Sequence, residues 1–332
     1  MAIVRRIAIA AFCVLIGGAA MSGEGSAFDI EAHRGGRALL PENTLASFAN
    51  ALSMGVDTLE LDIGVTRDGA IVVSHERGLN PDLARGPDGT YVAAPGTPFV
   101  RLTLEEVRKF DVGQIRPGSK YAAQFPDQRA VLDAKIPTLK EVIELVRKSG
   151  DGHVRLNIET KIDPDYPEES PEPERFVALL LDLLRAEKFE HRVMVQSFDW
   201  RTLQQARKLA PDIPTVYLTT QSGSQPTVAL DRATAWSAGF DPQQYGNSLP
   251  RTIKAAGGAI WSPYFGDVTP ALVSESHALG LQVVVWTVNR PADMARMIEM
   301  RVDGIISDHP DVLRQVAAGK GIALPKGFPV TP

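Results

Sequence analysis

The sequence is poor in cysteine, in positive charge and in long apolar runs, and each shortage excludes a class of protein. Its 332 residues include one cysteine, Cys13, so a disulfide framework cannot stabilise the fold and core packing must do so. The formal net charge of −5 argues against a nucleic-acid partner, because binding the phosphate backbone usually requires a basic face. What remains is an ordinary soluble composition, with 44% hydrophobic and 23% charged residues.

The N-terminal residues have the pattern of a secretory signal peptide. Two arginines, Arg5 and Arg6, precede an apolar run from Ile7 to Ala20, and small, mostly polar residues follow up to Ala27. The run is short for a bilayer span, and the small residues form an exit of the kind that signal peptidases cleave. We predict that residues 1–27 are removed and that the protein is exported, to the periplasm or outside the cell, without stable membrane insertion. An uncleaved membrane anchor is the alternative.

From Phe28 onward, short β-branched runs alternate with helical patterns, which predicts an α/β fold with a parallel sheet. Eight such units suggest a closed (β/α)₈ barrel spanning residues 28–332. An open doubly wound sheet is the alternative, but no glycine-rich dinucleotide turn follows any strand. The expected strands are Asp29–His33, Asp57–Val65, Val154–Thr160, Arg192–Phe198, Thr215–Thr219, Ala259–Pro263, Gln282–Val288 and Gly304–Asp308. The expected helices are Leu45–Met54, Leu139–Lys148, Phe176–Lys188, Trp200–Leu209, Pro270–Leu279 and Ala292–Met300.

The alternation is interrupted once, between residues 76 and 136. This stretch is rich in proline, glycine and charge, with one expected helix at Leu104–Phe110, and it is far longer than ordinary connections. It directly follows His75, so in a barrel it would lie over the end that carries the chemistry. We predict an inserted subdomain that caps the mouth of the barrel; a surface loop without a role is the alternative.

Acidic side chains at two strand ends suggest a metal site. Glu60 and Asp62 are two positions apart on one strand, so they share a face, while Leu59 and Leu61 indicate that the opposite face is buried. Two carboxylates this close repel each other unless a cation or a proton lies between them, and a hard divalent ion is the natural partner. Glu159, on the third strand, can complete the site. A solvated acidic strand end is the alternative.

Basic side chains and histidines accompany these carboxylates. Arg34 and Lys161 follow the first and third strands and can bind an anionic group, which favours a phosphate ester over a carbonyl substrate. Salt bridges from both to the carboxylates are the alternative. His33 and His75 stand at strand ends and suggest an acid–base pair, one activating the attacking oxygen and one protonating the leaving alcohol.

Weaker candidates lie at other strand ends. Gln196 and Trp286 combine hydrogen-bonding and aromatic groups that suit a small polyol-like fragment of a substrate, although packing and helix capping explain them equally well. Asn43 or Thr44 is expected to cap the first helix, and Glu42 to hold the preceding loop.

Together these motifs resemble those of the glycerophosphodiester phosphodiesterases over nearly the whole chain after residue 27. The matching motifs are His33-Arg34-Gly35, Pro41-Glu42-Asn43-Thr44, Glu60-Leu61-Asp62, Ser74-His75-Glu76, Glu159-Thr160-Lys161, Gln196-Ser197-Phe198, Trp286-Thr287-Val288-Asn289 and Ser307-Asp308. One departure is Glu76, where Asp is common in that family. The stretch after His75 looks like the insertion of one branch of the family that includes exported members.

The resemblance implies a TIM barrel with metal ligands at Glu60, Asp62 and Glu159. It also implies acid–base catalysis by His33 and His75, and phosphate contacts from Arg34 and Lys161. The implied reaction is hydrolysis of a glycerophosphodiester to glycerol 3-phosphate and an alcohol, with Ca²⁺ or Mg²⁺ favoured by the all-oxygen ligands. A phospholipase D-like enzyme acting on lysophospholipids and a non-catalytic exported binder of glycerophosphodiesters are the alternatives.

Overall fold

A computed structural model describes residues 28–222 and 225–332 of the chain. The predicted signal peptide, residues 1–27, lies outside the described residues, so its prediction stays untested. Among the helices that are described, none is both long enough and apolar enough to cross a membrane.

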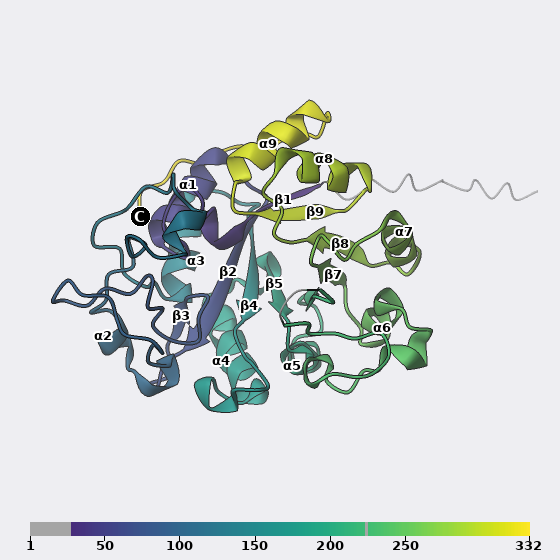
Figure 1. Cartoon of the computed structure of the whole chain (residues 1–332), viewed down its shortest axis with the longest axis horizontal. Helices are drawn as coiled ribbons and strands as arrows, with labels where there is room; N and C mark the ends of the chain where they lie inside the picture. Colours follow the sequence, from purple (N-terminus) through teal and green to yellow (C-terminus); the bar gives the residue numbers. More distant parts are fainter. Residues whose placement is uncertain (1–27, 223–224) are drawn as a thin grey trace, which may run out of the picture.

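Parallel strands form a closed barrel at the centre of the molecule (Figure 1). Each strand pairs with its neighbour, and β1 pairs with both β2 and β9, which closes the ring. In the described part of the chain the eight parallel strands are β1 (Asp29–Ala32), β2 (Thr58–Val65), β4 (Arg155–Thr160), β5 (Val193–Ser197), β6 (Thr215–Thr219), β7 (Ile260–Pro263), β8 (Gln282–Val285) and β9 (Gly304–Ser307). The predicted (β/α)₈ barrel is confirmed.

Helices surround the barrel and cover the outer faces of the strands. They are α1 (Leu45–Met54), α2 (Leu104–Val107), α3 (Leu139–Ser149), α4 (Pro173–Ala186), α5 (Trp200–Leu209), α6 (Leu249–Ala255), α7 (Pro270–Ala278), α8 (Pro291–Glu299) and α9 (Pro310–Gly319). In α3, Thr138 and Glu141 form a capping box and Gly150 ends the helix in a left-handed conformation. The sequence analysis missed α6 and α9, which begin with a proline in their first turn.

The interior of the barrel is divided into an apolar and a polar half. From β5 to β9 the inward positions carry an apolar cluster of Met194, Val216, Ile260, Val284 and Ile306. From β1, β2 and β4 they carry buried polar side chains, namely Glu31, Glu60, Asp62, Asn157 and Glu159. Because side chains alternate along a strand, the intervening residues of β2 pack outward against the helices.

One strand of the sheet was not predicted. The short strand β3 (Ile71–Val73) runs antiparallel to β2, with Ile63 opposite Val73. After this hairpin the backbone N–H of Ser74 donates to the carbonyl oxygen of Asp62 at 2.9 Å. His75 therefore does not follow a barrel strand, as the sequence analysis assumed, but reaches the barrel mouth because β3 turns the chain back to the level of Asp62.

The connection between β3 and α3, residues 76–136, gathers on one side of the barrel (Figure 1). It contains α2, which is shorter than the expected helix, and packs its own apolar cluster around Leu79, Phe99 and Val107. The ring of Phe99 lies against Gly64 of β2, where an added Cβ would be only 2.9 Å from the ring. This connection, called the β3–α3 segment below, is thus anchored to the barrel, while its capping role stays a prediction.

Replacing Phe99 should show how much this anchor stabilises the protein. Phe99 is 1% exposed, so Phe99→Ala leaves a cavity and should lower the free energy of unfolding by about 3–5 kcal/mol. The control is Leu132→Ala in the same segment; Leu132 is 85% exposed, and its loss should change stability by less than about 0.5 kcal/mol. Urea unfolding of both variants measures the difference, and equal effects would contradict the anchoring role.

Candidate active site

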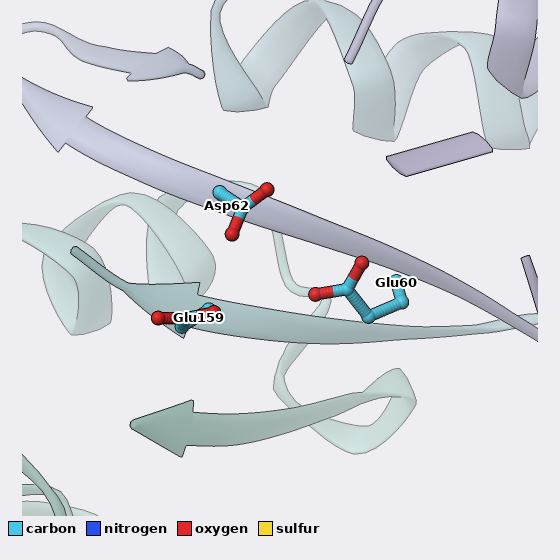
Figure 2. Close-up of side chains that lie close together, drawn as sticks. All are labelled: Glu60, Asp62 and Glu159. Atoms are coloured by element: carbon cyan, nitrogen blue, oxygen red, sulfur yellow. The ribbon is translucent and has the colours of Figure 1, made fainter. Parts of the chain in front are cut away.

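Three carboxylates converge at the mouth of the barrel (Figure 2). Glu60 and Asp62 extend from β2 and Glu159 from the neighbouring strand β4, where Asp62 and Glu159 are register partners. One oxygen from each of the three side chains lies within 4.8 Å of the others, and all three residues are buried. The structure therefore brings together the three residues predicted as metal ligands.

The electrostatics of this cluster favour a bound cation. Burial and the neighbouring charges of Asp62 and Glu159 raise the pKa of Glu60 well above its usual range. Burial raises the pKa of Glu159 to about 7. Burial also opposes ionisation of Asp62, but Arg34 and Lys161 hold the pKa of Asp62 below its usual range. Among the described residues, Oδ1 of Asp62 has no hydrogen-bond partner. A hard divalent cation fits such an oxygen-only, charge-crowded site.

Two basic side chains border the carboxylates. Arg34 pairs with Glu42 at 3.0 Å and with Asp62 at 3.4 Å. Lys161 pairs with Glu159 at 2.8 Å and lies 3.7 Å from Asp62. The salt bridges considered as an alternative role are thus present. These salt bridges leave hydrogen-bond donors of both side chains available for a substrate, because an arginine has five N–H donors and a lysine three. Arg34 also lines the cavity described below.

His33 is held by a buried carboxylate that the sequence analysis placed in a motif but gave no role. Its Nδ1 lies 2.6 Å from Oδ1 of Asp308, whose other oxygen accepts from the amide of Asn289 at 2.7 Å. Although Asp308 is buried, its contacts with His33 and Arg37 hold the pKa of Asp308 below its usual range. Asp308 is thus an acceptor, so the proton of His33 lies on Nδ1 and Nε2 can accept one.

His75 has a similar arrangement at a more exposed position. Its Nδ1 lies 3.0 Å from Oε1 of Glu76, the residue that departs from the family pattern. Burial, reinforced by Arg34 and Lys161, lowers the pKa of His75 to about 3. Burial likewise lowers the pKa of His33 to about 4, against the opposing effect of Asp308. Burial thus favours the neutral form of both imidazoles, in which each can accept a proton.

A cavity of about 150 Å³ joins these groups. Its polar side is formed by both histidines, Arg34, Glu60, Glu159 and Gln196. Its apolar side includes Trp286 and Phe198, whose rings pack edge to face at 5.3 Å. Gln196 donates its amide to Oε1 of Glu60 at 2.6 Å, so besides lining the cavity it orients a carboxylate. Each of the nine predicted site residues lines this cavity or contacts a residue that does.

The loop between β1 and α1 contributes supporting residues. Thr44 is the N-cap of α1, one of the two residues proposed for that role. Asn43 takes a left-handed conformation instead, and its amide donates to Oδ2 of Asp62 at 2.9 Å. Glu42 binds Arg34, as expected for a residue that holds this loop. Arg37, which the sequence analysis did not select, donates to Asp308 at 2.6 Å.

Fold and site together define a class of protein. The carboxylates suit a divalent cation, the basic groups suit an anionic oxygen, and the imidazoles can move protons, all within one cavity at the end of a parallel barrel. The class is that of a hydrolase for phosphoric esters.

Comparison with known proteins gives the family. A model of the glycerophosphoryl diester phosphodiesterase family matches residues 33–312. A glycerophosphodiester phosphodiesterase of Caldanaerobacter subterraneus is 32% identical over 85% of this chain and 94% of its own length. This chain belongs to the glycerophosphoryl diester phosphodiesterase family. The predicted family and the prediction of a phosphodiesterase are thereby confirmed.

The chain is also similar to a solved structure and to a relative with a different named activity. A solved structure from Silicibacter pomeroyi, provisionally assigned to the same activity, has a TM-score of 0.80 and 36% identity; the match covers 91% of this chain and 97% of that one. A lysophospholipase D of Mus musculus is 26% identical over 85% of this chain and 83% of its own length.

The low pKa of His33 predicts a pH dependence of stability. The pKa is about 4 in the folded protein and about 6.5 for an unperturbed histidine, so between these values the unfolded chain binds more protons. The contribution of neutral His33 to stability is complete above about pH 6.5 and is lost as the pH falls toward 4. His33→Gln should flatten this part of the pH profile, measured by urea unfolding in the presence of a chelator. An unchanged slope between the two proteins would contradict the buried, neutral imidazole.

Proposed function

We propose that this protein is a metal-dependent enzyme that hydrolyses glycerophosphodiesters to glycerol 3-phosphate and an alcohol, with acid–base catalysis by two histidines. The observation that carries the proposal is the carboxylate cluster of Glu60, Asp62 and Glu159 beside His33 and His75 at one cavity. The Caldanaerobacter relative, a glycerophosphodiester phosphodiesterase at 32% identity, supports the same substrate class.

In the proposed reaction, the acidic residues bind the metal ion and the basic residues bind the phosphate. Glu60, Asp62 and Glu159 would hold one divalent cation, Ca²⁺ or Mg²⁺, which when bound supplies Lewis-acid polarisation of a phosphoryl oxygen. Arg34 and Lys161 add positive charge beside the phosphate and stabilise the charge that develops on its oxygens. Gln196 fixes the orientation of Glu60 through its 2.6 Å hydrogen bond.

The histidines move the protons of the reaction. The nucleophile, a water molecule or a glycerol hydroxyl, loses its proton to Nε2 of one imidazole while its oxygen bonds to phosphorus. The bond from phosphorus to the alcohol oxygen breaks, and the other imidazole, which takes up a proton from solvent before the step, gives that proton to the leaving oxygen. The imidazolium formed in the attack then returns its proton to solvent, so the net change is the addition of one water molecule. Where the glycerol hydroxyl attacks, the product is a cyclic phosphate, which water then opens in the same way to give glycerol 3-phosphate. Asp308 and Glu76 accept from Nδ1 of His33 and His75, which keeps both Nε2 atoms available.

A second candidate substrate is a lysophospholipid, cleaved in a phospholipase D-like reaction. The lysophospholipase D relative and the apolar side of the cavity, with Phe198, Leu218 and Trp286, favour it. The cavity of about 150 Å³ favours the smaller, water-soluble diesters, because it is below the size usual for larger ligands. Parallel assays on glycerophosphocholine and on a lysolipid distinguish the two.

Metal removal and a single ligand substitution test the main proposal. Chelation should abolish release of glycerol 3-phosphate from glycerophosphocholine, and resupplied Ca²⁺ or Mg²⁺ should restore it. Glu60→Gln keeps the size of the side chain but removes the charge, and should lower kcat/KM by at least about 100-fold. The control, Glu168→Gln, makes the same change on an exposed loop and should leave turnover unchanged. Turnover at the wild-type rate after chelation, or in Glu60→Gln, would refute the proposal.

We also propose that the protein is exported after cleavage behind Ala27. The support is the charged start, the short apolar run and the small residues in the sequence. The full chain expressed in a secreting bacterial host should yield a product whose N-terminus is Phe28, measured by intact mass. Ala27→Arg should block cleavage and leave the longer chain with the membranes, because the small residue at the cleavage site is lost. A processed protein that begins elsewhere, or one that stays in the cytosol, would contradict this.

A further inference from the structure

Besides Glu76, which pairs with His75, the β3–α3 segment contacts the loop between β1 and α1 through a short stretch, residues 121–129. The backbone N–H of Arg129 donates to the carbonyl oxygen of Leu39 at 3.0 Å. The amide of Gln128 donates to the carbonyl oxygen of Arg37 at 2.6 Å. Both acceptors lie in the loop between β1 and α1, which also carries His33 and Arg34.

Tyr121 makes the contact that links this stretch to the catalytic groups. Its hydroxyl donates a hydrogen bond to Oε2 of Glu42 and accepts from Nη1 of Arg37 at 3.3 Å. The tyrosine is half-buried and packs edge to face on Phe125 at 5.3 Å, which fixes the direction of its ring. One oxygen atom thus connects a carboxylate and a guanidinium that belong to the same loop.

Each of these partners holds a different active-site residue. Arg37 donates from Nε to Oδ1 of Asp308 at 2.6 Å, and the same oxygen accepts from Nδ1 of His33 at 2.6 Å. The guanidinium of Arg37 also lies 4.9 Å from the centre of the Phe125 ring, a distance at which a cation–π contact is attractive. Glu42 accepts from Nη1 of Arg34 at 3.0 Å.

We infer that Tyr121 is a positioning residue for His33, acting through Arg37 and Asp308, and that its bond to Glu42 keeps Arg37 in place. If the Tyr121 hydroxyl is removed, Oε2 of Glu42 loses its neutral donor, while Oε1 of Glu42 still accepts from Arg34. The guanidinium of Arg37 lies 3.9 Å from the unpaired Oε2. Loss of that donor draws Arg37 toward the carboxylate and away from Asp308, because a buried carboxylate oxygen needs a partner. His33 then loses the fixed orientation on which proton transfer depends.

This inference rests on the proposed hydrolysis and gives the β3–α3 segment a specific part in it. The segment completes the active site by holding the loop between β1 and α1 in place, in addition to any covering of the mouth. Activity should therefore depend on a hydroxyl group that belongs to no predicted catalytic motif.

Tyr121→Phe tests the inference with the removal of one oxygen atom. We expect kcat for release of glycerol 3-phosphate from glycerophosphocholine to fall by about 10- to 100-fold, as is typical when a partner of a catalytic group is lost. KM should change by less than about threefold, because orientation and not substrate binding is affected. The control is Tyr91→Phe: Tyr91 lies in the same segment, is also half-buried, and donates its hydroxyl to the carbonyl oxygen of Gln114 at 3.1 Å.

A purely structural role would give a different result. In that case Tyr121→Phe and Tyr91→Phe would lower the melting temperature alike and leave kcat at the wild-type value, which overturns the inference. A double variant provides a second measurement: Arg37→Lys keeps the charge but cannot bind Asp308 and Tyr121 together. Tyr121→Phe added to Arg37→Lys should cause little further loss, whereas losses that multiply in full would show that Tyr121 does not act through Arg37.

A readout without turnover separates this inference from the proposed function. The proton between His33 and Asp308 should give a downfield NMR resonance that is absent in His33→Gln. It should shift or broaden in Tyr121→Phe and remain in Tyr91→Phe; an unchanged resonance in Tyr121→Phe overturns the inference even if no diester is cleaved. A wild-type protein that releases no glycerol 3-phosphate would instead refute the proposed function.

Discussion

Mutual repulsion among three buried carboxylates is the constraint on which the site depends. Within 4.8 Å and at an effective dielectric constant of about 20, each pair of fully ionised carboxylates would repel by at least about 3.5 kcal/mol. The surrounding groups reduce this repulsion. Arg34 and Lys161 place positive charge near Asp62. The amide of Asn43 donates to Asp62, and the amide of Gln196 donates to Glu60. A divalent cation would complete the compensation, and the same positive charge that balances the carboxylates suits a phosphate.

The fold supplies this arrangement by dividing the barrel interior. Three adjacent strands, β1, β2 and β4, turn acidic and amide side chains inward, and β5 adds Gln196, while the apolar cluster from β5 to β9 fills the opposite half. The hairpin of β2 and β3 then returns His75 to the level of Asp62. The candidate catalytic groups from distant parts of the sequence thus meet on one side of the mouth, with the aromatic pair of Phe198 and Trp286 bordering the cavity.

The sequence alone predicted those features of the fold and site that depend on a local pattern of residues. Strands of β-branched residues alternating with amphipathic helices predict the barrel, and the spacing of Glu60 and Asp62 predicts a shared face. Local patterns could not reveal β3, which has three residues, or the role of Asp308, which lies 275 positions from its partner His33. Arg37 and Tyr121 were missed for the same reason. Their partners are brought to them by the closed barrel and by the β3–α3 segment.

The pairing of β1 with β9 has a consequence for the synthesis of the protein. Ala32, just before His33, is the register partner of Ser307, just before Asp308, so the first and last strands of the ring each supply one member of this pair. A nascent chain that has emerged only as far as β8 can already contain the carboxylate cluster and both imidazoles. It cannot yet hold His33 in its working orientation. Under the proposed mechanism, enzymatic activity therefore requires a closed ring, and a ribosome-bound or truncated intermediate would not hydrolyse its substrate until the final strand is in place.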